Sequence, residues 1–370
     1  MAGVRYHEGQ FPPRTLDWQV LVPLIGPASA ALARYDGMLA AIPNPGVLLA
    51  PLGTQEAVLS SRIEGTQATM GEVLEYEAGN DTAAGARRDD IHEILNYRKA
   101  MWTAAELLRD LPFSQRVIRD VHRILLAGVR GANKSLGEYR RVPNWIGPER
   151  GGIEEARFVP IGADKLTDAM SAWEAYAYED PPDSLVQLAL LHVEFEALHP
   201  FLDGNGRLGR MLVPLFLWQR DLIGLPMFYI SAYFEAHREA YYERLLAVSR
   251  DEDWTGWCRF FLIAVREQAE DNLARAKAIL ALYDELRHRM PEMTRSQYAT
   301  KALDWLFAQP IFSSSDFIAV SAIPESTARR FLRLLRDEEI LSQIQPASGS
   351  RPAILAFARL LEIAEGRKAD

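Results

Sequence analysis

A proline that separates two apolar helical stretches constrains the fold of this chain more than any other feature. Residues 184–198, SLVQLALLHVEFEAL, carry an apolar face at helical spacing and begin with a serine. Pro200 prevents this helix from continuing unbroken, and the helical pattern resumes near Gly204 in RLGRMLVPLFLWQR. Asp203 is placed to cap or flank the second helix. The sequence therefore predicts two helices joined by a corner, with His199 at or just past the end of the first.

The twelve residues of this corner, HPFLDGNGRLGR (199–210), combine groups that suit polyphosphate binding. A helix N-terminus exposes unpaired N–H groups and a positive dipole end, and glycines let the backbone wrap closely around an anion. Arg207 and Arg210 are three residues apart, so both can lie on one side of the first helical turns. Asp203 can hold Mg²⁺ together with phosphate oxygens, and His199 can act as a base beside them. These parts suit phosphoryl or nucleotidyl transfer to a hydroxyl.

Three other interpretations of the corner are weaker. GNGRLG matches the dinucleotide-binding pattern G-x-G-x-x-G, but that pattern must follow a buried strand, and HVEFEALHPFLD is not one. DGNG resembles the start of an EF-hand loop, but Arg207 and Leu208 occupy the positions where that loop needs an acceptor and a glycine. The third interpretation is a capped helix–turn–helix corner with two surface arginines, which the density of special residues disfavours.

HPFLDGNGRLGR closely resembles the signature of the Fic family, H-P-F-x-[D/E]-G-N-G-R-x-x-R, and agrees with it at every defined position. The resemblance implies a mainly α fold, a helical bundle with a β-hairpin flap over the active site. It also implies an adenylyltransferase that moves AMP from ATP to a Ser, Thr or Tyr hydroxyl of a target protein. His199 would deprotonate that hydroxyl, Asp203 would coordinate Mg²⁺ between the α- and β-phosphates, and Phe201 would anchor the loop in the core.

The same resemblance implies the residues that bind ATP. The corner glycines and Asn205 would form the anion hole, Arg207 would contact the β-phosphate, and Arg210 would contact the γ-phosphate. His237, in YISAYFEAHREAYY, falls in the region beside the adenine but stands where many relatives have Asn, so a surface histidine is the alternative. The full set of expected ATP-binding residues is Glu64, Gly204, Asn205, Gly206, Arg207, Leu208, Gly209, Arg210 and His237.

A short motif near the N-terminus resembles the inhibitory motif of the family, [S/T]-x-x-x-E-[G/N]. SSRIEG places Ser60, Glu64 and Gly65 at its defined positions. In such relatives the glutamate pairs with the second motif arginine, here Arg210. A carboxylate on that guanidinium removes the partner of the γ-phosphate and repels ATP. By this analogy we expect autoinhibition; a glutamate that positions water for removing AMP, or one that is simply solvated, are the alternatives.

Helical patterns cover most of the chain, with one clear interruption. Helices are predicted at about 28–41, 54–65, 88–110, 114–128, 164–178, 184–198, 254–289 and 298–308, with Ser114 as an N-cap. Between them, VPNWIG and ARFVP are β-like runs around a Gly-Gly turn, which predicts a hairpin at about 143–160. This hairpin would be the flap, able to pair with an extended target segment; an ordinary covering hairpin is the alternative.

The last segment, 295–370, predicts a winged-helix module. QYATKALDWLF predicts a helix, the next stretch predicts a helix, a turn and a helix that starts near Pro324, and SQIQPASGSRPAILAF predicts two short strands. The second helix of the pair carries four arginines, Arg329, Arg330, Arg333 and Arg336. The segment has 10 Lys and Arg against 9 Asp and Glu, and this near-neutral balance favours protein docking or dimer support over DNA binding.

Length and composition set the remaining expectations. The 370 residues suggest an N-terminal helical region over 1–110, a catalytic core with a following long helix over 111–290, and the module over 295–370. No apolar run approaches the roughly 18 residues that span a bilayer, and the N-terminus has no signal-peptide pattern, so a cytoplasmic location is expected. A single cysteine, Cys258, excludes a disulfide framework and a thiolate zinc site.

Three functions remain open at this point. The leading one is an autoinhibited adenylyltransferase that uses ATP and Mg²⁺, with a hydroxyl-bearing target protein, self-modification and a homodimer as expected partnerships. The second is a DNA-binding regulator whose Fic core only senses nucleotide, although a net charge of −9 argues against a chain that mainly coats nucleic acid. The third keeps the enzyme but transfers phosphate, phosphocholine or UMP, or removes AMP.

Overall fold

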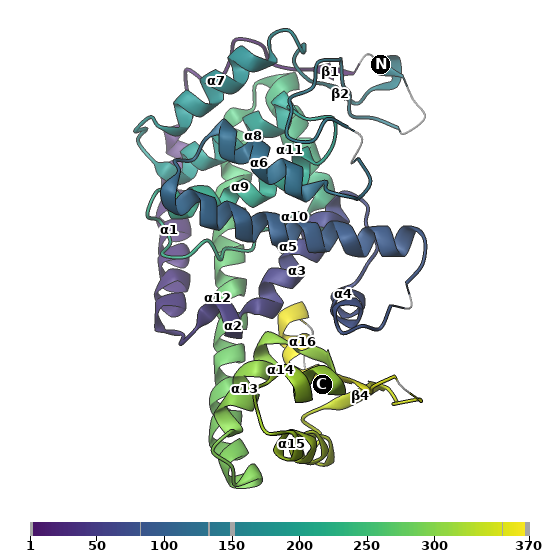
Figure 1. The fold of residues 1–370 in the computed structure, drawn as a ribbon. Coiled ribbons are helices and arrows are strands. Elements are labelled where there is room, and N and C mark those ends of the chain that lie inside the picture. Colours follow the sequence, from purple (N-terminus) through teal and green to yellow (C-terminus); the bar gives the residue numbers. More distant parts are fainter. Residues whose placement is uncertain (1–2, 82, 132–133, 149–151, 350, 367–370) are drawn as a thin grey trace. The chain divides into compact units, whose positions relative to one another are not determined.

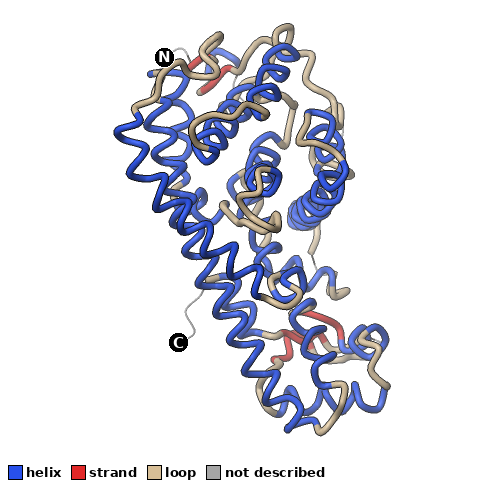
Figure 2. The backbone as a smooth tube through the Cα atoms, turned by 90° about the vertical axis from the view of Figure 1, so that its left-hand side faces the viewer, coloured by secondary structure: helices blue, strands red, loops and turns tan. Residues whose placement is uncertain are grey.

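The computed structural model describes residues 3–81, 83–131, 134–148, 152–349 and 351–366. Helices dominate it, and its few strands are short (Figure 2). The chain forms two compact units: unit 1 comprises Met1–Asp36, Leu59–Gly65 and Leu95–Glu270, and unit 2 comprises Gly37–Val58, Thr66–Ile94 and Asp271–Asp370. The predicted mainly α fold is therefore confirmed. No helix in the described part of the chain is both long and apolar enough to cross a membrane.

Unit 1 is built around two helices that pack against each other, α8 (Ser184–Leu198) and α9 (Asn205–Gln219) (Figure 1). All residues of α8 except Ser184 and Glu196 are buried, because its apolar side chains extend around the whole helix. The side chain of Asp183 caps α8 by accepting hydrogen bonds from the N–H groups of Leu185 and Val186. The surrounding elements are α6 (Gln115–Leu125), α7 (Leu166–Ala177), α10 (Ser231–Ala236) and α11 (Arg238–Asp251).

Four long helices contribute residues to both units. They are α1 (Trp18–Ala41), α3 (Ala50–Ile63), α5 (Ala86–Asp110) and α12 (Trp254–Thr294). Helix α1 begins ten residues before its predicted start, since the buried Leu21 stabilises its first turns despite Pro23 and Pro27. Helix α3 begins before the predicted Thr54 and ends at Ile63, close to the expected end at Gly65, whose φ is 105°.

The segment predicted as a hairpin contains one antiparallel bridge instead of two paired strands. Ile146 exchanges hydrogen bonds of 2.9 and 3.0 Å with Phe158, and a 3₁₀ turn, η1 (Ile153–Glu155), lies between them in the chain. The predicted turn includes residues 149–151, which lie outside the described residues. Strand β2 (Phe158–Val159) instead pairs in parallel with β1 (Val4–Arg5), a partner that local sequence patterns did not indicate.

Two side chains next to β1 attach it to α8. The Tyr6 hydroxyl donates to Glu194 Oε1 at 2.6 Å, and His7 Nε2 lies 2.8 Å from Glu194 Oε2. His7 Nδ1 is 2.7 Å from the Ser249 hydroxyl of α11. The N-terminal segment therefore holds β2, and with it the segment that follows Trp145, beside the helices of unit 1.

Unit 2 combines segments from both halves of the chain. Its C-terminal elements run α13 (Ala299–Ala308), β3 (Ile311–Ser313), α14 (Ser314–Val320), α15 (Glu325–Asp337), β4 (Ser342–Gln345), β5 (Ile354–Ala356) and α16 (Ala358–Glu365). The strands form an antiparallel sheet in the order β3-β5-β4. Helix α2 (Pro45–Leu48) packs on α13, and α4 (Met70–Glu77), which starts with a capping box formed by Thr69 and Glu72, packs on β3.

Candidate active site

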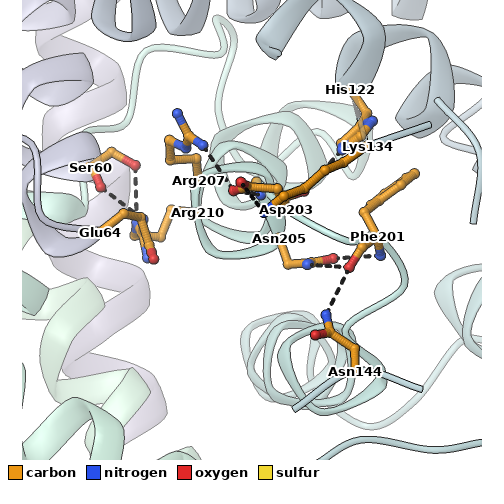
Figure 3. Close-up of polar contacts among 11 residues, drawn as sticks. Ser60, Glu64, His122, Lys134, Asn144, Phe201, Asp203, Asn205, Arg207 and Arg210 are labelled. Atoms are coloured by element: carbon orange, nitrogen blue, oxygen red, sulfur yellow. Dashed lines mark hydrogen bonds and ion pairs between the residues drawn. The ribbon is translucent and has the colours of Figure 1, made fainter. Parts of the chain in front are cut away.

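The corner between α8 and α9 is held in shape by its own side chains. His199 ends α8 in a left-handed conformation with φ 47°, and Gly204 begins α9 with φ 78°. Asn205 closes the loop between them, because its side-chain amide accepts from the Phe201 N–H at 2.8 Å and donates to the Phe201 carbonyl at 2.9 Å. Phe201 is fully buried and stacks on His122 with ring centroids 3.8 Å apart. Figure 3 shows these contacts.

Asp203 carries the carboxylate of the corner, and both of its oxygens have partners. Oδ1 accepts from the Gly204 N–H at 2.7 Å and lies 3.4 Å from an Arg207 nitrogen. Oδ2 lies 3.2 Å from Lys134 Nζ (Figure 3). His122 Nε2 donates to the Asp203 carbonyl at 3.0 Å, while its Nδ1 accepts from the Gly137 N–H. Burial lowers the pKa of His122 to about 4, which suits this neutral tautomer.

Arg210 is bound by the helix that precedes Gly65. Its Nε donates to the Ser60 hydroxyl at 3.0 Å, and its Nη2 donates to the Ser60 carbonyl at 2.8 Å and to Glu64 Oε1 at 2.6 Å (Figure 3). The Arg210 side chain is 1% exposed, whereas that of Glu64 is 34% exposed. Burial alone would raise the pKa of Glu64, but the charge and the hydrogen bond of Arg210, together with the nearby Arg207 charge, outweigh burial and lower that pKa. Glu64 is therefore ionised at neutral pH and occupies the guanidinium.

Contacts to its backbone carbonyl and to its ring hold His199 in place. Arg140 Nε donates to the His199 carbonyl at 2.9 Å, and Arg140 Nη2 donates to the Leu198 carbonyl at 3.2 Å. One guanidinium therefore caps the end of α8. His199 Nδ1 faces the Glu196 carbonyl oxygen at 3.4 Å. Burial lowers the pKa of His199 to about 4, so that the imidazole is neutral near pH 7 and can accept a proton.

These groups surround one cavity of about 930 Å³. Of the residues named from sequence, it is lined by Glu64, His199, Asp203, Gly204, Asn205, Gly206 and Arg210. The structure does not bring the other predicted contacts to its wall. The Arg207 guanidinium turns to Asp203, Leu208 lies in the core, and the Gly209 carbonyl contacts His192 at 3.2 Å. His237 is exposed at the junction of α10 and α11, its Nδ1 bonds to the Tyr233 carbonyl, and it does not line the cavity.

Several cavity residues were not singled out from the sequence. Lys134 comes from an irregular segment, and Glu196 looks like an ordinary polar position on an apolar helix. Asn144 and Arg157 lie in the segment predicted as the flap, 143–160, but neither was named as a site residue. Tyr241 and Tyr242 lie in YISAYFEAHREAYY, the stretch that had been associated with the adenine through His237. Both tyrosines lie about one helical turn after His237, so a search of that stretch for aromatic residues one turn further along would have identified them.

The donor set at the corner fits a hard cation only in combination with phosphate. Among the described residues, no cluster of three or more His, Cys, Asp or Glu side chains could enclose a metal ion. Asp203 offers a carboxylate on the cavity wall directly before the first residues of α9, and the Glu64 carboxylate is already paired with Arg210. Mg²⁺ commonly takes one or two carboxylates and completes its shell with water and substrate phosphates, so this set suits Mg²⁺ bound with a polyphosphate.

Comparison with known proteins places this geometry in one family. Residues 22–106 match the family model described as Fic/DOC family N-terminal, and residues 112–217 match the model described as Fic/DOC family. Curated relatives include proteins named protein adenylyltransferase Fic from Drosophila grimshawi and Drosophila virilis. Each is 28% identical over 202 residues, which are 54% of this chain and 38% of the relative. The chain thus spans well under half the length of these relatives.

Solved structures show the same fold. A Fic family protein from Desulfovibrio desulfuricans superposes with a TM-score of 0.60 at 20% identity, covering 94% of this chain and 98% of that one. A Fic domain containing signaling protein from Bacteroides thetaiotaomicron gives a TM-score of 0.56 at 18% identity, covering 69% and 97%. Two family models that together match more than half of the residues, and a shared fold over nearly the whole length, lead to one conclusion: this chain is a member of the Fic/DOC family.

Proposed function

We propose that this chain is a protein adenylyltransferase, which transfers AMP from ATP to a hydroxyl side chain of a target protein, and that Glu64 inhibits it. One observation carries the proposal: His199, Asp203, the amides of Gly204–Gly206 and Arg210 line a single cavity of about 930 Å³. This volume suits a nucleotide. The names of the curated relatives support AMP as the transferred group.

In the proposed reaction, His199 accepts the proton of the target hydroxyl while the hydroxyl oxygen attacks the α-phosphorus of ATP. The bond from that phosphorus to the oxygen bridging the β-phosphate breaks, and pyrophosphate leaves. A proton on Nδ1 that faces the Glu196 carbonyl leaves the Nε2 lone pair available as the acceptor. The amides at the start of α9 and the Arg210 guanidinium would stabilise the phosphate charges.

Asp203 would hold Mg²⁺ in this proposal, with Lys134 displaced from Oδ2. When bound, the ion neutralises phosphate charge and orients the α- and β-phosphates. Arg207, which lies against Asp203 and outside the cavity lining, would position the carboxylate. A contact from Arg207 to the β-phosphate would require its side chain to leave Asp203.

Glu64 would inhibit the enzyme by occupying Arg210. Its carboxylate takes the place of a γ-phosphate on the guanidinium and adds a like charge to the site that triphosphate must enter. The Ser60 contacts keep Arg210 turned towards α3. Removing the carboxylate would free the guanidinium for the nucleotide.

Two measurements test the proposal: which phosphorus of ATP is transferred to protein, and whether transfer needs His199. The Glu64→Gly variant is incubated with magnesium and with ATP radiolabelled at either the α- or the γ-phosphorus. We expect label to enter protein from the α position only, and His199→Ala in the same background to reduce the rate by about 10²- to 10⁴-fold with ATP binding preserved. Label from the γ position would show phosphate transfer, and a normal rate without His199 would refute its role as base. Mass spectrometry of the modified protein identifies the added group.

For the C-terminal elements we propose a winged-helix module that docks protein. The element order helix, strand, two helices and two strands supports the module. Three of the four arginines of α15 have partners in the chain: Arg329 bonds to Glu325, Arg336 bonds to Gln343, and Arg330 bonds to the Thr294 carbonyl at the end of α12. These bonds and the near-neutral charge disfavour DNA binding. A homodimer and a cytoplasmic location stay predictions from sequence.

A further inference from the structure

Two glycines on one face of α9 leave room for two carboxyl groups beside Arg210. Gly206 and Gly209 are three residues apart and therefore neighbours on the helix surface, and Arg210 follows directly. A Cβ atom on Gly206 would collide with Glu64 Oε1 and would lie 3.1 Å from Arg210 Nη1. A Cβ atom on Gly209 would collide with Glu196 Oε1 in the same way. The two glutamates thus occupy adjacent notches of the helix that carries Arg210.

Glu196 differs from Glu64 in having no partner for this oxygen. Its Oε1 is buried and accepts no hydrogen bond among the described residues, yet the residue lines the nucleotide cavity. A buried carboxylate without a partner is costly, so the neutral acid is favoured. Burial raises the pKa of Glu196 to about 8; the Arg210 charge opposes this rise and the Glu64 charge adds to it. With Glu64 in place, Glu196 is a neutral acid near pH 7.

We propose that Glu196 is a second carboxyl partner of Arg210, held in reserve while Glu64 occupies the guanidinium and drawn to it when Glu64 is absent. The inference rests on the proposed nucleotide site. Without the Glu64 charge, Glu196 loses a repelling neighbour and keeps the attraction of Arg210, so that it ionises more easily. Its carboxylate then competes with a bound phosphate as Glu64 does. Nucleotide binding to an enzyme without Glu64 must therefore return a proton to Glu196.

The buried histidines and tyrosines near Glu196 have pKa values outside the range from pH 6 to 9. On α8, burial lowers the pKa of His192 to about 3 and that of His199 to about 4. On α11, burial raises the pKa of Tyr241 and of Tyr242 above the usual value. Arg210 on α9 stays charged with or without Glu64, because a guanidinium does not lose its proton in this pH range. A protein proton taken up in this pH range therefore points to Glu196.

The direction of the pH effect follows from this assignment. Glu196 is neutral below its pKa and charged above it, so nucleotide affinity of the Glu64→Gly variant should fall as the pH rises. The change of log Kd with pH equals the number of protons taken up on binding. One proton therefore limits the effect to a tenfold change in Kd per pH unit. The nucleotide's own terminal phosphate also titrates near pH 6. Its contribution is the same in the double variant Glu64→Gly/Glu196→Gln, so it cancels when the two variants are compared.

Calorimetry of nucleotide binding tests the inference. The full chain with Glu64→Gly, and the same chain with Glu196→Gln added, are titrated with α,β-methylene ATP and magnesium from pH 6 to 9. Each titration uses two buffers of different ionisation enthalpy. We expect Glu64→Gly to take up as much as one proton more per nucleotide than the double variant, and to lose affinity up to tenfold more steeply per pH unit. Glu155→Gln, the same substitution elsewhere on the cavity wall, should leave that difference in place.

The outcomes separate the inference from the function on which it rests. Equal proton uptake and equal pH slopes in the two variants, with both binding nucleotide, would overturn the role of Glu196 and leave the proposed function standing. Nucleotide binding without AMP transfer would overturn the proposed function alone, while a difference in proton uptake would still support Glu196. Absence of binding at every pH in both folded variants would overturn both.

Discussion

Lys134 Nζ lies 3.2 Å from Asp203 Oδ2, so an ammonium group of the chain itself sits on the oxygen that a divalent cation would need. The other oxygen, Oδ1, is oriented by the Gly204 N–H. A cation bound at Oδ2 would displace Lys134, which Figure 3 shows beside Asp203, and would leave the Gly204 contact of Oδ1 intact. The proposed metal site therefore carries a competing charge.

Replacing Lys134 with methionine should strengthen divalent cation binding. The Lys134 side chain is 47% exposed, and an ion pair of this kind contributes about 0.2–1 kcal/mol, so we expect Mn²⁺ affinity in the presence of ATP to rise about 1.4- to fivefold. Electron paramagnetic resonance of free Mn²⁺ measures this without turnover. Lys165→Met, which removes a lysine paired with Glu8, is the control and should leave the affinity unchanged. Unchanged or weaker Mn²⁺ binding in Lys134→Met would contradict the competition.

Replacing Ser60 with alanine should partly relieve the inhibition. The change removes the hydroxyl that accepts from Arg210 Nε and leaves the Glu64 pair in place, so we expect self-modification to rise about two- to tenfold, less than in Glu64→Gly. Ser61→Ala is a matched control, because the Ser61 hydroxyl is buried and has no hydrogen-bond partner within the described residues. A Ser60→Ala rate at or below that of Ser61→Ala, at equal thermal stability, would rule out this support.

Protonation of His192 should destabilise the protein in acid. The ring is 3% exposed, lies 3.2 Å from the Gly209 carbonyl and 2.9 Å from the Tyr241 hydroxyl, and burial lowers its pKa from 6.5 to about 3. Below pH 6.5 the unfolded chain binds a proton that the folded chain does not, so stability is lost as the pH falls towards 3. At pH 5 the loss from this residue is about 2 kcal/mol.

Urea unfolding at pH 7 and pH 5 measures this loss. His192→Gln should lose less stability between the two pH values than the wild type, although it is less stable at pH 7. His288→Gln removes an exposed histidine and should keep the wild-type difference. The same loss in His192→Gln as in the wild type would show that the buried ring is not the group responsible.

Local chemistry accounts for the parts of the fold that could be predicted. Helix α8 has the predicted bounds, 184–198, because an apolar stretch and a proline are properties of neighbouring residues. The corner follows from the same local causes, since a glycine readily adopts the positive φ of Gly204. Helix α1 was predicted too short because Pro23 and Pro27 count against a helix locally, whereas burial of Leu21 in the folded chain counts for one.

The sequence by itself determined the corner, the residue types in it and, through resemblance, the family. The resemblance also predicted that Glu64 would pair with Arg210. Only the tertiary structure decided the other distant contacts: Ser60 with Arg210, Lys134 with Asp203, and Glu196 beside Gly209. The physical reason is that periodicity and backbone preference act over a few residues, while charge and burial depend on what the folded chain brings near. The sequence pattern of an apolar helix is the same whether Glu196 faces water or lies near a buried arginine. The protonation state and the reactivity of Glu196 differ between these two environments.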